Sequence, residues 1–377
     1  MNTMTRSNVR LMASARSWID SEAIRQLYAN ARRPGVDLAV GLPDLHSGKG
    51  VPVGAAFVTN GQIHPQLIGP DVGCGLSLFK TDIPQRKVQL DRWASVRFDL
   101  EHPWEGDASA RLAHENLCAT QWADSFGTLG SRNHFAELQS VEEVFDAEAF
   151  NRLGLAQEEL VALVHSGSRD FGAMILETHL EASGANGLAA DSESGVEYLL
   201  LHDHAVTWAR ANRAVLAERF VHAIGGRCQR VLDSCHNAIA RRDDSDASTR
   251  WVHRRGAAPS DAGPLVIAGT RGTFSYLVEP TGDQSANAWS VAHGAGRKWM
   301  RSESRLRVRE RFHADELVQT ALGGRVICEE RNLLYEEAPM AYKTIEAVIG
   351  DLVEMGLVAI IASLRPVLSY KTRKVRR

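Results

Sequence analysis

The fold class is decided by residues 38–82, which read LAVGLPDLHSGKGVPVGAAFVTNGQIHPQLIGPDVGCGLSLFKTD. Glycines are dense in this stretch, and they separate short apolar runs at Ala39–Leu42, Val51–Val58 and Leu76–Phe79. Short apolar runs bounded by turn residues are typical of buried β-strands joined by tight turns. The stretch therefore predicts a β-rich core.

Other segments around this core carry helical or strand patterns. Four segments are expected to be helical: 20–32, 108–124, 195–222 and 340–354. Three more are expected to contain strands: 160–164, 263–278 and 357–363, the last ending before Pro366. Motifs run from Gly41 to Lys371 with no evident linker. The pattern therefore predicts a mixed α/β (α+β) fold over residues 1–377, in one large domain with a central β-rich core and flanking helices.

The composition argues against a globally basic, a disulfide-rich or a membrane-spanning protein. The 377 residues are 44% hydrophobic, and 43 Lys and Arg against 46 Asp and Glu give a net charge of -3, so any nucleic-acid surface must be local. The five cysteines are scattered without CxxC spacing, which favours a reducing compartment over a disulfide framework. No signal peptide or membrane-spanning run is evident, so we expect a cytoplasmic protein with no membrane partner.

Two segments are expected to lie outside the packed domain. Residues 241–249, which are acidic and serine-rich, are expected to form a mobile surface loop. Residues 372–377 form a basic C-terminal tail. Together with Lys371, this tail could bind phosphate groups or stay solvated and disordered.

Residue types that bind metals occur beside glycines. Asp71 and Cys74 lie three positions apart in Gly69–Gly75, and a carboxylate oxygen beside a thiolate suits a metal site in which sulfur can bridge two cations. His134 follows a glycine turn, and His165 ends an expected strand. Read singly, each has an ordinary alternative, such as a buried structural cysteine or a partly buried histidine.

Two further groups complete the metal-binding candidates. The segment Ser-Cys-His-Asn at 234–237 offers His236 as another imidazole, the commonest type of metal ligand. His202 and His204 flank Asp203, and we expect them on a helix surface or behind the ligands. The combination of ligand types beside glycines favours a metal site over a series of coincidences.

A second constellation suits phosphate chemistry. In residues 290–297, His293 is followed by Gly294 and Gly296, which leave its ring uncrowded and let the backbone approach a phosphate. Arg297 could clamp the same phosphate. A neutral imidazole beside a triphosphate is a suitable nucleophile for a phosphoramidate intermediate.

Three more segments could contact a nucleotide. Arg169 follows the turn His-Ser-Gly-Ser and carries a planar fork that suits phosphate, although a solvated surface arginine is an equal alternative for this piece alone. Glu137, three residues after His134, could accept hydrogen bonds from a base edge. The glycine turn at 269–272 is a weak nucleotide signal by itself.

These motifs, in this order, resemble the RtcB family of RNA-splicing ligases. The resemblance runs from Gly41 to Lys371 and rests on seven segments: LPDLHSGKG (42–50), GPDVGCG (69–75), NHF (133–135), HSGSR (165–169), HRRGA (253–257), HGAGR (293–297) and EEAPMAYK (336–343). It implies an RtcB-like domain whose cleft takes metal and nucleotide.

The resemblance also implies a role for each matching residue. Two Mn²⁺ ions would be bound by five ligands, with the Cys74 thiolate between them: Asp71, Cys74, His134, His165 and His236. His293 would become guanylylated by GTP. Nucleotide or RNA-end contacts would come from seven residues: Asn133, Glu137, Arg169, Gly294, Gly296, Arg297 and Lys371. Of these, Glu137 and Lys371 would address the guanine.

The implied activity is GTP-dependent ligation of RNA 3′-phosphate or 2′,3′-cyclic phosphate ends to 5′-hydroxyl ends, in repair of tRNA or damaged ribosomal RNA. Two alternatives stay open: a non-catalytic RNA- or ribosome-binding homologue, and a metal-dependent phosphodiesterase. The phosphodiesterase has no obvious use for the glycine-rich segment after His293. Archease or a release-factor-like protein is the kind of partner that the family implies.

The sequence departs from the family pattern at several places. Gly-Thr-Arg-Gly at 269–272 replaces a turn usually written Gly-Ser-Met-Gly, Ala292 precedes His293 where a polar residue is common, and Asp170 follows Arg169 where glycine is usual. The compact length and these variants are similar to the short branch associated with release factor H.

Overall fold

The computed structural model describes residues 8–117, 122–130, 133–183, 186–243 and 249–373. Its largest element is an eight-stranded sheet in the order β13-β14-β17-β6-β7-β5-β9, with β16 paired to β17. The strands are β5 (Gly75–Pro84), β6 (Phe135–Val144), β7 (Glu159–Ser166), β9 (Cys228–Cys235), β13 (Leu265–Ile267), β14 (Ser275–Pro280), β16 (Arg325–Cys328) and β17 (Val358–Thr372).

A five-stranded sheet in the order β1-β2-β3-β11-β10 lies beside the first. Its strands are β1 (Val9–Leu11), β2 (Val36–His46), β3 (Val53–Asn60), β10 (Asn237–Asp243) and β11 (Thr249–Arg255). Two short pairs complete the strands: β4 (Gln62–Ile63) with β8 (Leu188–Ala189), and β12 (Ala257–Pro259) with β15 (Ser290–Ala292).

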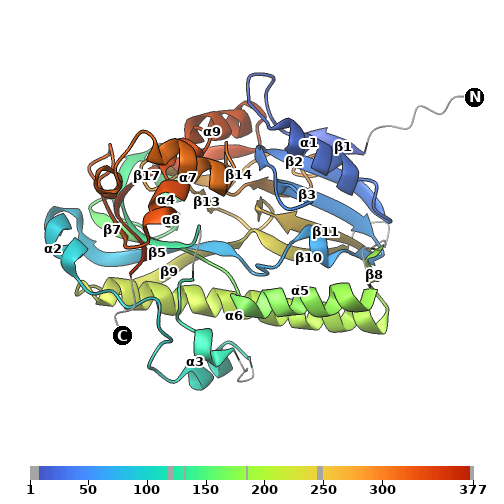
Figure 1. Ribbon diagram of the computed structural model, residues 1–377, viewed down its shortest axis with the longest axis horizontal. Helices are drawn as coiled ribbons and strands as arrows, with labels where there is room; N and C mark the ends of the chain where they lie inside the picture. The colour runs from blue at the N-terminus through green and yellow to red at the C-terminus, as the bar shows by residue number, and fades with distance from the viewer. Residues whose placement is uncertain (1–7, 118–121, 131–132, 184–185, 244–248, 374–377) are drawn as a thin grey trace, which may run out of the picture.

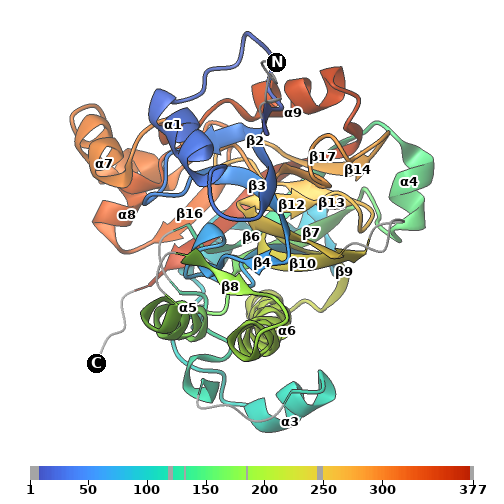
Figure 2. The ribbon, with the colours of Figure 1, turned by 90° about the vertical axis from the view of Figure 1, so that its right-hand side faces the viewer.

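Helices cover the sheets on both sides (Figures 1 and 2). The long α6 (Glu193–His222) runs beside α5 (Asp170–Ser183) along one side of the molecule and packs against β5, β7 and β9. The remaining helices are α1 (Ser21–Asn30), α2 (Leu90–Ser95), α3 (Ala108–His114), α4 (Ala147–Arg152), α7 (Arg301–Arg309), α8 (Arg331–Glu336) and α9 (Ile345–Glu354). Among the helices in the described ranges, none is both long and apolar enough to cross a membrane.

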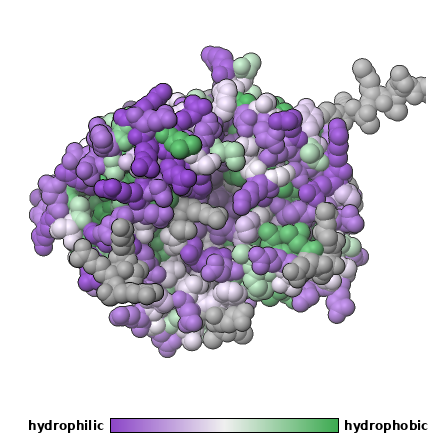
Figure 3. Space-filling view, viewed as in Figure 1, coloured by the Kyte–Doolittle hydropathy of each residue, from purple (hydrophilic) through white to green (hydrophobic). Residues whose placement is uncertain are grey.

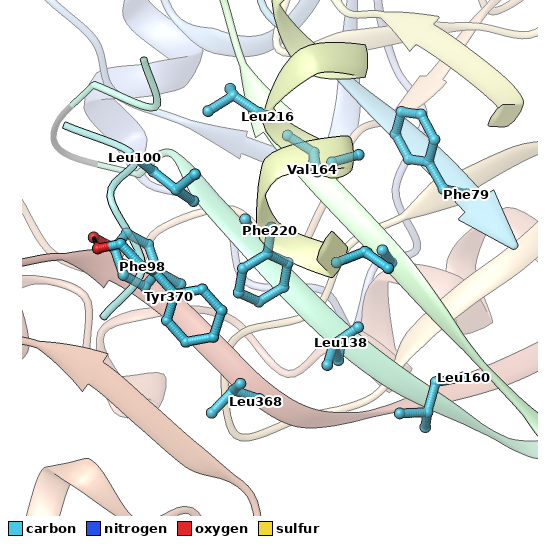
Figure 4. Packing of buried hydrophobic residues seen from close by; sticks show 14 of the residues in the cluster. Phe79, Phe98, Leu100, Leu138, Leu160, Val164, Leu216, Phe220, Leu368 and Tyr370 are labelled. Atoms are coloured by element: carbon cyan, nitrogen blue, oxygen red, sulfur yellow. Dashed lines mark hydrogen bonds between the residues drawn. The ribbon is translucent and has the colours of Figure 1, made fainter. Parts of the chain in front are cut away.

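Alternation along β7 assigns its side chains to two cores. Leu160, Ala162 and Val164 pack in the cluster that contains Leu216 and Phe220 of α6 (Figure 4). The intervening Val161 and Leu163 pack in a separate cluster on the other face. Because side chains alternate between faces of a strand, His165 follows Val161 and Leu163 and points away from α6.

The α+β fold is confirmed, as are the helices expected in 20–32, 195–222 and 340–354, which correspond to α1, α6 and α9. The helix expected at 108–124 is wrong in length: α3 ends at His114. Asn116 adopts φ 60°, a left-handed conformation that commonly terminates a helix. Residues 118–121 lie outside the described residues.

The strand expected to end before Pro366 is also wrong in length, since β17 continues to Thr372. The pairing of β17 with β6 shifts register between Pro366 and Leu368. A proline is tolerated at such an irregularity because its missing N–H interrupts no regular ladder.

The two segments expected outside the domain are partly ordered. Asp243 pairs with Thr249, so β10 and β11 extend into the predicted loop 241–249, and residues 244–248 lie outside the described residues. In the predicted tail 372–377, Arg373 donates to Glu329 and to the carbonyl oxygens of Ala94 and Val96. Residues 374–377 are not described.

Candidate metal and nucleotide site

The candidate metal ligands come from one end of four neighbouring strands. In the order β6-β7-β5-β9, adjacent strands are antiparallel, so the starts of β6 and β5 lie beside the ends of β7 and β9. Register places Phe135 opposite His165, and Gly75 opposite both Ser166 and Cys235. His134, Cys74 and His236 are the residues adjacent to these positions. Strand pairing therefore gathers ligands that are far apart in the sequence.

The side-chain atoms of these residues converge. The Cys74 Sγ atom lies 3.2 Å from His165 Nε2 and 3.6 Å from His134 Nε2. His165 Nε2 lies 3.2 Å from His236 Nε2, and His134 Nε2 lies 3.0 Å from the Asp71 carboxylate. Two groups of potential ligands result, and both contain Cys74: Cys74, His165 and His236; and Asp71, Cys74 and His134.

The hydrogen bonds of the rings indicate what this cluster is suited to hold. His134 Nδ1 donates to the Leu129 carbonyl oxygen at 3.0 Å, and His165 Nδ1 donates to that of Asn133 at 3.3 Å. In a neutral imidazole, a proton on Nδ1 leaves a lone pair on Nε2. The Nε2 atoms of both rings lie beside the Cys74 sulfur. The Nε2 of His134 also faces the Asp71 carboxylate, and that of His165 faces His236 Nε2. Acceptors gathered this closely fit a shared cation, as does the mixed nitrogen, sulfur and oxygen donor set.

Burial affects the protonation of these groups. Desolvation and neighbouring positive charge hold the pKa of His165 and of His236 well below the ordinary value, which keeps both rings neutral. Burial and then the Asp71 charge raise the pKa of the Cys74 thiol. A bound cation opposes that rise by stabilising the thiolate.

Arg213 binds the backbone next to two members of the cluster. This role was not identified from the sequence. Its guanidinium is fully buried and pairs with Asp233 through Nε at 2.8 Å and Nη2 at 2.9 Å. Its Nη1 donates to the carbonyl oxygens of Gly73 and Ser166 at 2.7 and 2.8 Å. These two residues directly neighbour Cys74 and His165, so one ion pair fixes the backbone beside two candidate ligands. The signal in the sequence that could have indicated it is an arginine among the apolar residues of the long helix α6.

The Asp71 carboxylate packs so closely against residue 167 that only glycine fits there. A Cβ atom at residue 167 would overlap the Asp71 carboxylate. The turn after His165 can therefore approach the carboxylate only with glycine at this position.

His293 lies at the edge of the cluster, with its ring centroid 4.7 Å from that of His236. Its Nδ1 donates to the Asp44 carboxylate at 2.7 Å, and its backbone N–H bonds the same oxygen at 3.3 Å. Asp44 lies where the pairing of β2 with β3 shifts register between Gly41 and His46. Such irregularities redirect side chains. Asp44 lies within the segment 42–50, and no pattern in the sequence assigns it a role.

Lys343 holds the segment that carries Asp44. Its ammonium group donates to the carbonyl oxygens of Pro43 and Leu45, at 2.9 and 2.8 Å, on both sides of Asp44. Burial lowers the pKa of Lys343 to about 8, against the opposing effect of Asp44. The position of the His293 ring thus depends on Asp44, and that of Asp44 on Lys343.

A cleft of about 1200 Å³ opens over these residues. All five metal-ligand candidates and the predicted contacts Asn133, Arg169, Gly294, Gly296, Arg297 and Lys371 line it, as does His293. Cationic side chains outnumber acidic ones in the lining. Those that sequence reasoning did not single out are Arg33, Lys49, Arg255, Arg271, Lys298 and Arg301. The predicted residues are therefore brought together, with Glu137 set apart from the rest.

Glu137 lies behind the lining, on β6, with only 4% of its surface exposed. Its carboxylate accepts hydrogen bonds from Ser369 and Gln139. Burial raises its pKa, against the effect of these hydrogen bonds. The predicted contact between Glu137 and a guanine stays a prediction.

Two predicted phosphate or nucleotide contacts are engaged within the protein. Arg297 donates to five oxygens, from Trp299, Glu337, Tyr342, Ser304 and Glu336. Lys371 is buried and donates to the carbonyl oxygens of Asn133 and His134 at 3.2 and 3.3 Å. Lys371 therefore belongs to the core of the site, and the interpretation that grouped it with a solvated tail is wrong.

His202 is likewise internal. It is 1% exposed, and its Nε2 accepts the backbone N–H of Ile239 at 2.9 Å while Nδ1 contacts Asp203. Of the two positions expected for this residue, the helix surface is wrong and the position behind the candidate ligands stays a prediction. The buried hydrogen bond ties α6 to β10.

The fold and this site define a class of large α+β proteins built around a buried cysteine, histidine and aspartate cluster at the floor of a cationic cleft. The model of the family described as tRNA-splicing ligase RtcB matches residues 26–104 and 99–372. The chain belongs to this RtcB family.

The similarity to known proteins covers nearly the whole chain. An RNA-splicing ligase RtcB2 of Escherichia coli is 41% identical over 360 residues, covering 96% of this chain and 94% of the relative. The tRNA-splicing ligase RtcB of Thermococcus kodakarensis is 27% identical, covering 95% and 94% of the two chains. The RNA-splicing ligase RtcB of Escherichia coli K12 is 26% identical, covering 94% and 95%.

Proposed function

We propose that this protein is a GTP- and Mn²⁺-dependent RNA ligase that joins 3′-phosphate or 2′,3′-cyclic phosphate ends to 5′-hydroxyl ends through a guanylate on His293. The observation that carries the proposal is the Asp44–His293 pair beside the Cys74 cluster, at a cationic cleft. Relatives that bear the names RNA-splicing and tRNA-splicing ligase support RNA as the substrate.

The hydrogen bond to Asp44 prepares His293 as a nucleophile. With its proton on Nδ1, the ring has its lone pair on Nε2, the nitrogen left to form a bond. The Asp44 carboxylate also stabilises the positive charge that develops on the ring during attack. A ring in this tautomer needs no separate base, because the attacking Nε2 carries a lone pair and no proton.

The donor set fits divalent cations, and the choice of Mn²⁺ rests on the family resemblance. The residues that would hold them are Asp71, Cys74, His134, His165 and His236. When bound, such ions polarise phosphate oxygens and offset the negative charge of phosphoryl transfer. Arg213 keeps two of the ligand-bearing turns in place through the Gly73 and Ser166 carbonyls.

The proposed reaction has three bond exchanges. His293 Nε2 forms a bond to the α-phosphorus of GTP, and the bond to the leaving pyrophosphate breaks. An oxygen of the RNA 3′-phosphate then attacks the guanylate phosphorus, which frees His293 and yields an activated RNA end. Finally the 5′-hydroxyl of the second RNA attacks that end, loses its proton, and releases GMP. A 2′,3′-cyclic phosphate must first be opened by water to a 3′-phosphate.

Transfer of label from GTP tests this proposal. The purified protein, incubated with Mn²⁺ and α-³²P-GTP, should acquire a label that survives a denaturing gel, is released by acid and resists base. His293→Ala should lose the label, whereas His222→Ala, an exposed histidine at the end of α6, should keep it. A wild-type chain that never acquires label would point to a non-catalytic RNA-binding protein or a phosphodiesterase.

A further inference from the structure

A second pocket adjoins the cleft, with a volume of about 320 Å³. The segment Arg16–Trp18, the first turn of α9 and the pair Lys298 and Trp299 form its walls. Its size falls at the lower end of the range of about 300–1,000 Å³ that is usual for small-molecule pockets. It can hold about one nucleotide.

Two indole rings border this pocket. Trp18 is 55% exposed, and the Lys343 ammonium lies 5.9 Å from its ring centroid. Trp299 is half-buried, with the Arg307 guanidinium 5.0 Å from its ring centroid. Aromatic rings supported by cations are the platforms on which single-stranded nucleic acids stack their bases.

The described charged residues that line the pocket are all cationic. Arg16, Lys298 and Lys343 line it, and none of the described lining residues is acidic. Arg16 is paired with Glu354, and Lys343 is bound to backbone carbonyls. Lys298 is exposed, and no carboxylate within the described ranges lies at ion-pair distance from it. Its ammonium is therefore available to a phosphate.

The pocket and the cleft share part of their lining. Lys298 and Trp299 line both cavities, directly after Arg297 in the chain. The face of the molecule that carries α7 and α8 is mainly hydrophilic (Figure 3). A strand whose end lies in the cleft can thus pass Lys298 and place a neighbouring nucleotide beside Trp18.

We propose that this pocket, bounded by Trp18, Trp299 and Lys298, binds one unpaired nucleotide of the RNA substrate near its reacting end. The base stacks on Trp18, and Lys298 contacts a flanking phosphate. The occupant is single-stranded because only an unstacked base exposes its face to an aromatic side chain. This inference rests on the proposed function for the identity of the strand.

The first experiment measures binding of a fluorescent single-stranded RNA with a 3′-phosphate, by anisotropy. Trp18→Ala should weaken binding roughly 5- to 150-fold, the loss that corresponds to one stacked base. Trp18→Phe should retain most of the affinity. The matched control is Phe145→Ala, another exposed aromatic, which is 51% exposed and lies after β6. Equal affinity of Trp18→Ala and the wild-type chain would overturn the proposal.

A second experiment begins with the wild-type chain, so its first result does not depend on the folding of a variant. Abasic nucleotides are placed one at a time along the RNA, and binding to the wild-type chain is measured. One position near the 3′ end should lower the affinity, and that loss should vanish in Trp18→Ala. Equal effects at every position would overturn the proposal. Lys298→Gln should reduce the slope of log affinity against log salt by about 0.7, one phosphate contact to a single strand.

These outcomes are separable from the proposed function. Guanylylation of the wild-type chain by GTP is measured without RNA, so its failure overturns the ligase proposal while the RNA-binding results still decide the pocket. If RNA binds and Trp18 makes no difference, only the pocket assignment fails.

Discussion

The carboxylate of Asp44 holds the ring of His293 at 2.7 Å, although the two residues lie 249 positions apart in the chain. Asp44 is fully buried, whereas 17% of the His293 side chain is exposed to the cleft. A buried carboxylate thus orients a ring that faces the cleft. Both residues come from irregular backbone, at a register shift in β2 and just after β15.

Asp44→Asn should lower the rate of guanylylation. The amide is neutral, so it stabilises the developing positive charge on His293 poorly and no longer enforces the proton on Nδ1. We expect a loss of roughly 10²- to 10⁴-fold in single-turnover labelling. Metal content, measured by elemental analysis, should stay unchanged. A variant that labels at the wild-type rate would show that the pair has no catalytic role.

Lys343→Met should slow the same step more mildly. Methionine fills similar space but cannot bind the Pro43 and Leu45 carbonyls, so Asp44 loses its fixed position. We expect a decrease of roughly 10- to 100-fold in the labelling rate, with little change in the GTP concentration at half-saturation. The control is Lys87→Met, an exposed lysine distant in sequence from these residues. Equal rates in the two variants would contradict the positioning role.

Cys74→Ser should weaken metal binding by both ligand groups together. Cys74 belongs to both groups, and a serine oxygen is harder and a poorer bridge than a thiolate. Elemental analysis after dialysis should show fewer than one ion per chain. Cys228→Ser, a half-buried cysteine at the start of β9, should retain full occupancy. Loss of one ion with retention of the other would argue against a bridging sulfur.

Arg213→Met should destabilise the fold by about 3–5 kcal/mol, because the largely buried Asp233 carboxylate loses its charged partner. Urea unfolding measures this loss. The double variant Arg213→Met with Asp233→Leu should recover much of the stability, since no charge remains buried. It should still bind metal weakly, because the Gly73 and Ser166 carbonyls have lost their donor. Full recovery of metal affinity would remove Arg213 from the support of the site.

Glu337 should contribute to stability above acidic pH. Burial alone would raise its pKa, yet Lys371, Arg301 and Arg297 lower it from 4.5 to about 2. A carboxylate with a lowered folded-state pKa adds stability above its unfolded pKa, and that stability is lost as the pH falls toward the folded value. Between about pH 5 and pH 3, unfolding free energy should therefore fall less steeply in Glu337→Gln than in wild type. The exposed Glu310→Gln is the control. Identical slopes for all three chains would contradict this contribution.

Local patterns predicted much of the architecture because their causes are local. Helical spacing of apolar residues anticipated α1, α6 and α9, and short apolar runs between glycines anticipated β2, β3 and β5. The same patterns missed the end of α3 and the continuation of β17 past Pro366. Those boundaries depend on one left-handed residue and on a shift in strand register, and neither changes the apolar periodicity.

The sequence by itself determined the element types, the family resemblance and the residue types able to bind metal or phosphate. Only the tertiary structure decided which of them meet. The pairing of β6, β7, β5 and β9 brings His134, His165, Cys74 and His236 together. The tertiary structure also places Glu137 behind the cleft lining, engages Arg297 within the protein and joins Asp44 to His293. The physical reason is that side-chain periodicity is a property of neighbouring residues, whereas these contacts depend on strand register and the burial of charges between distant segments.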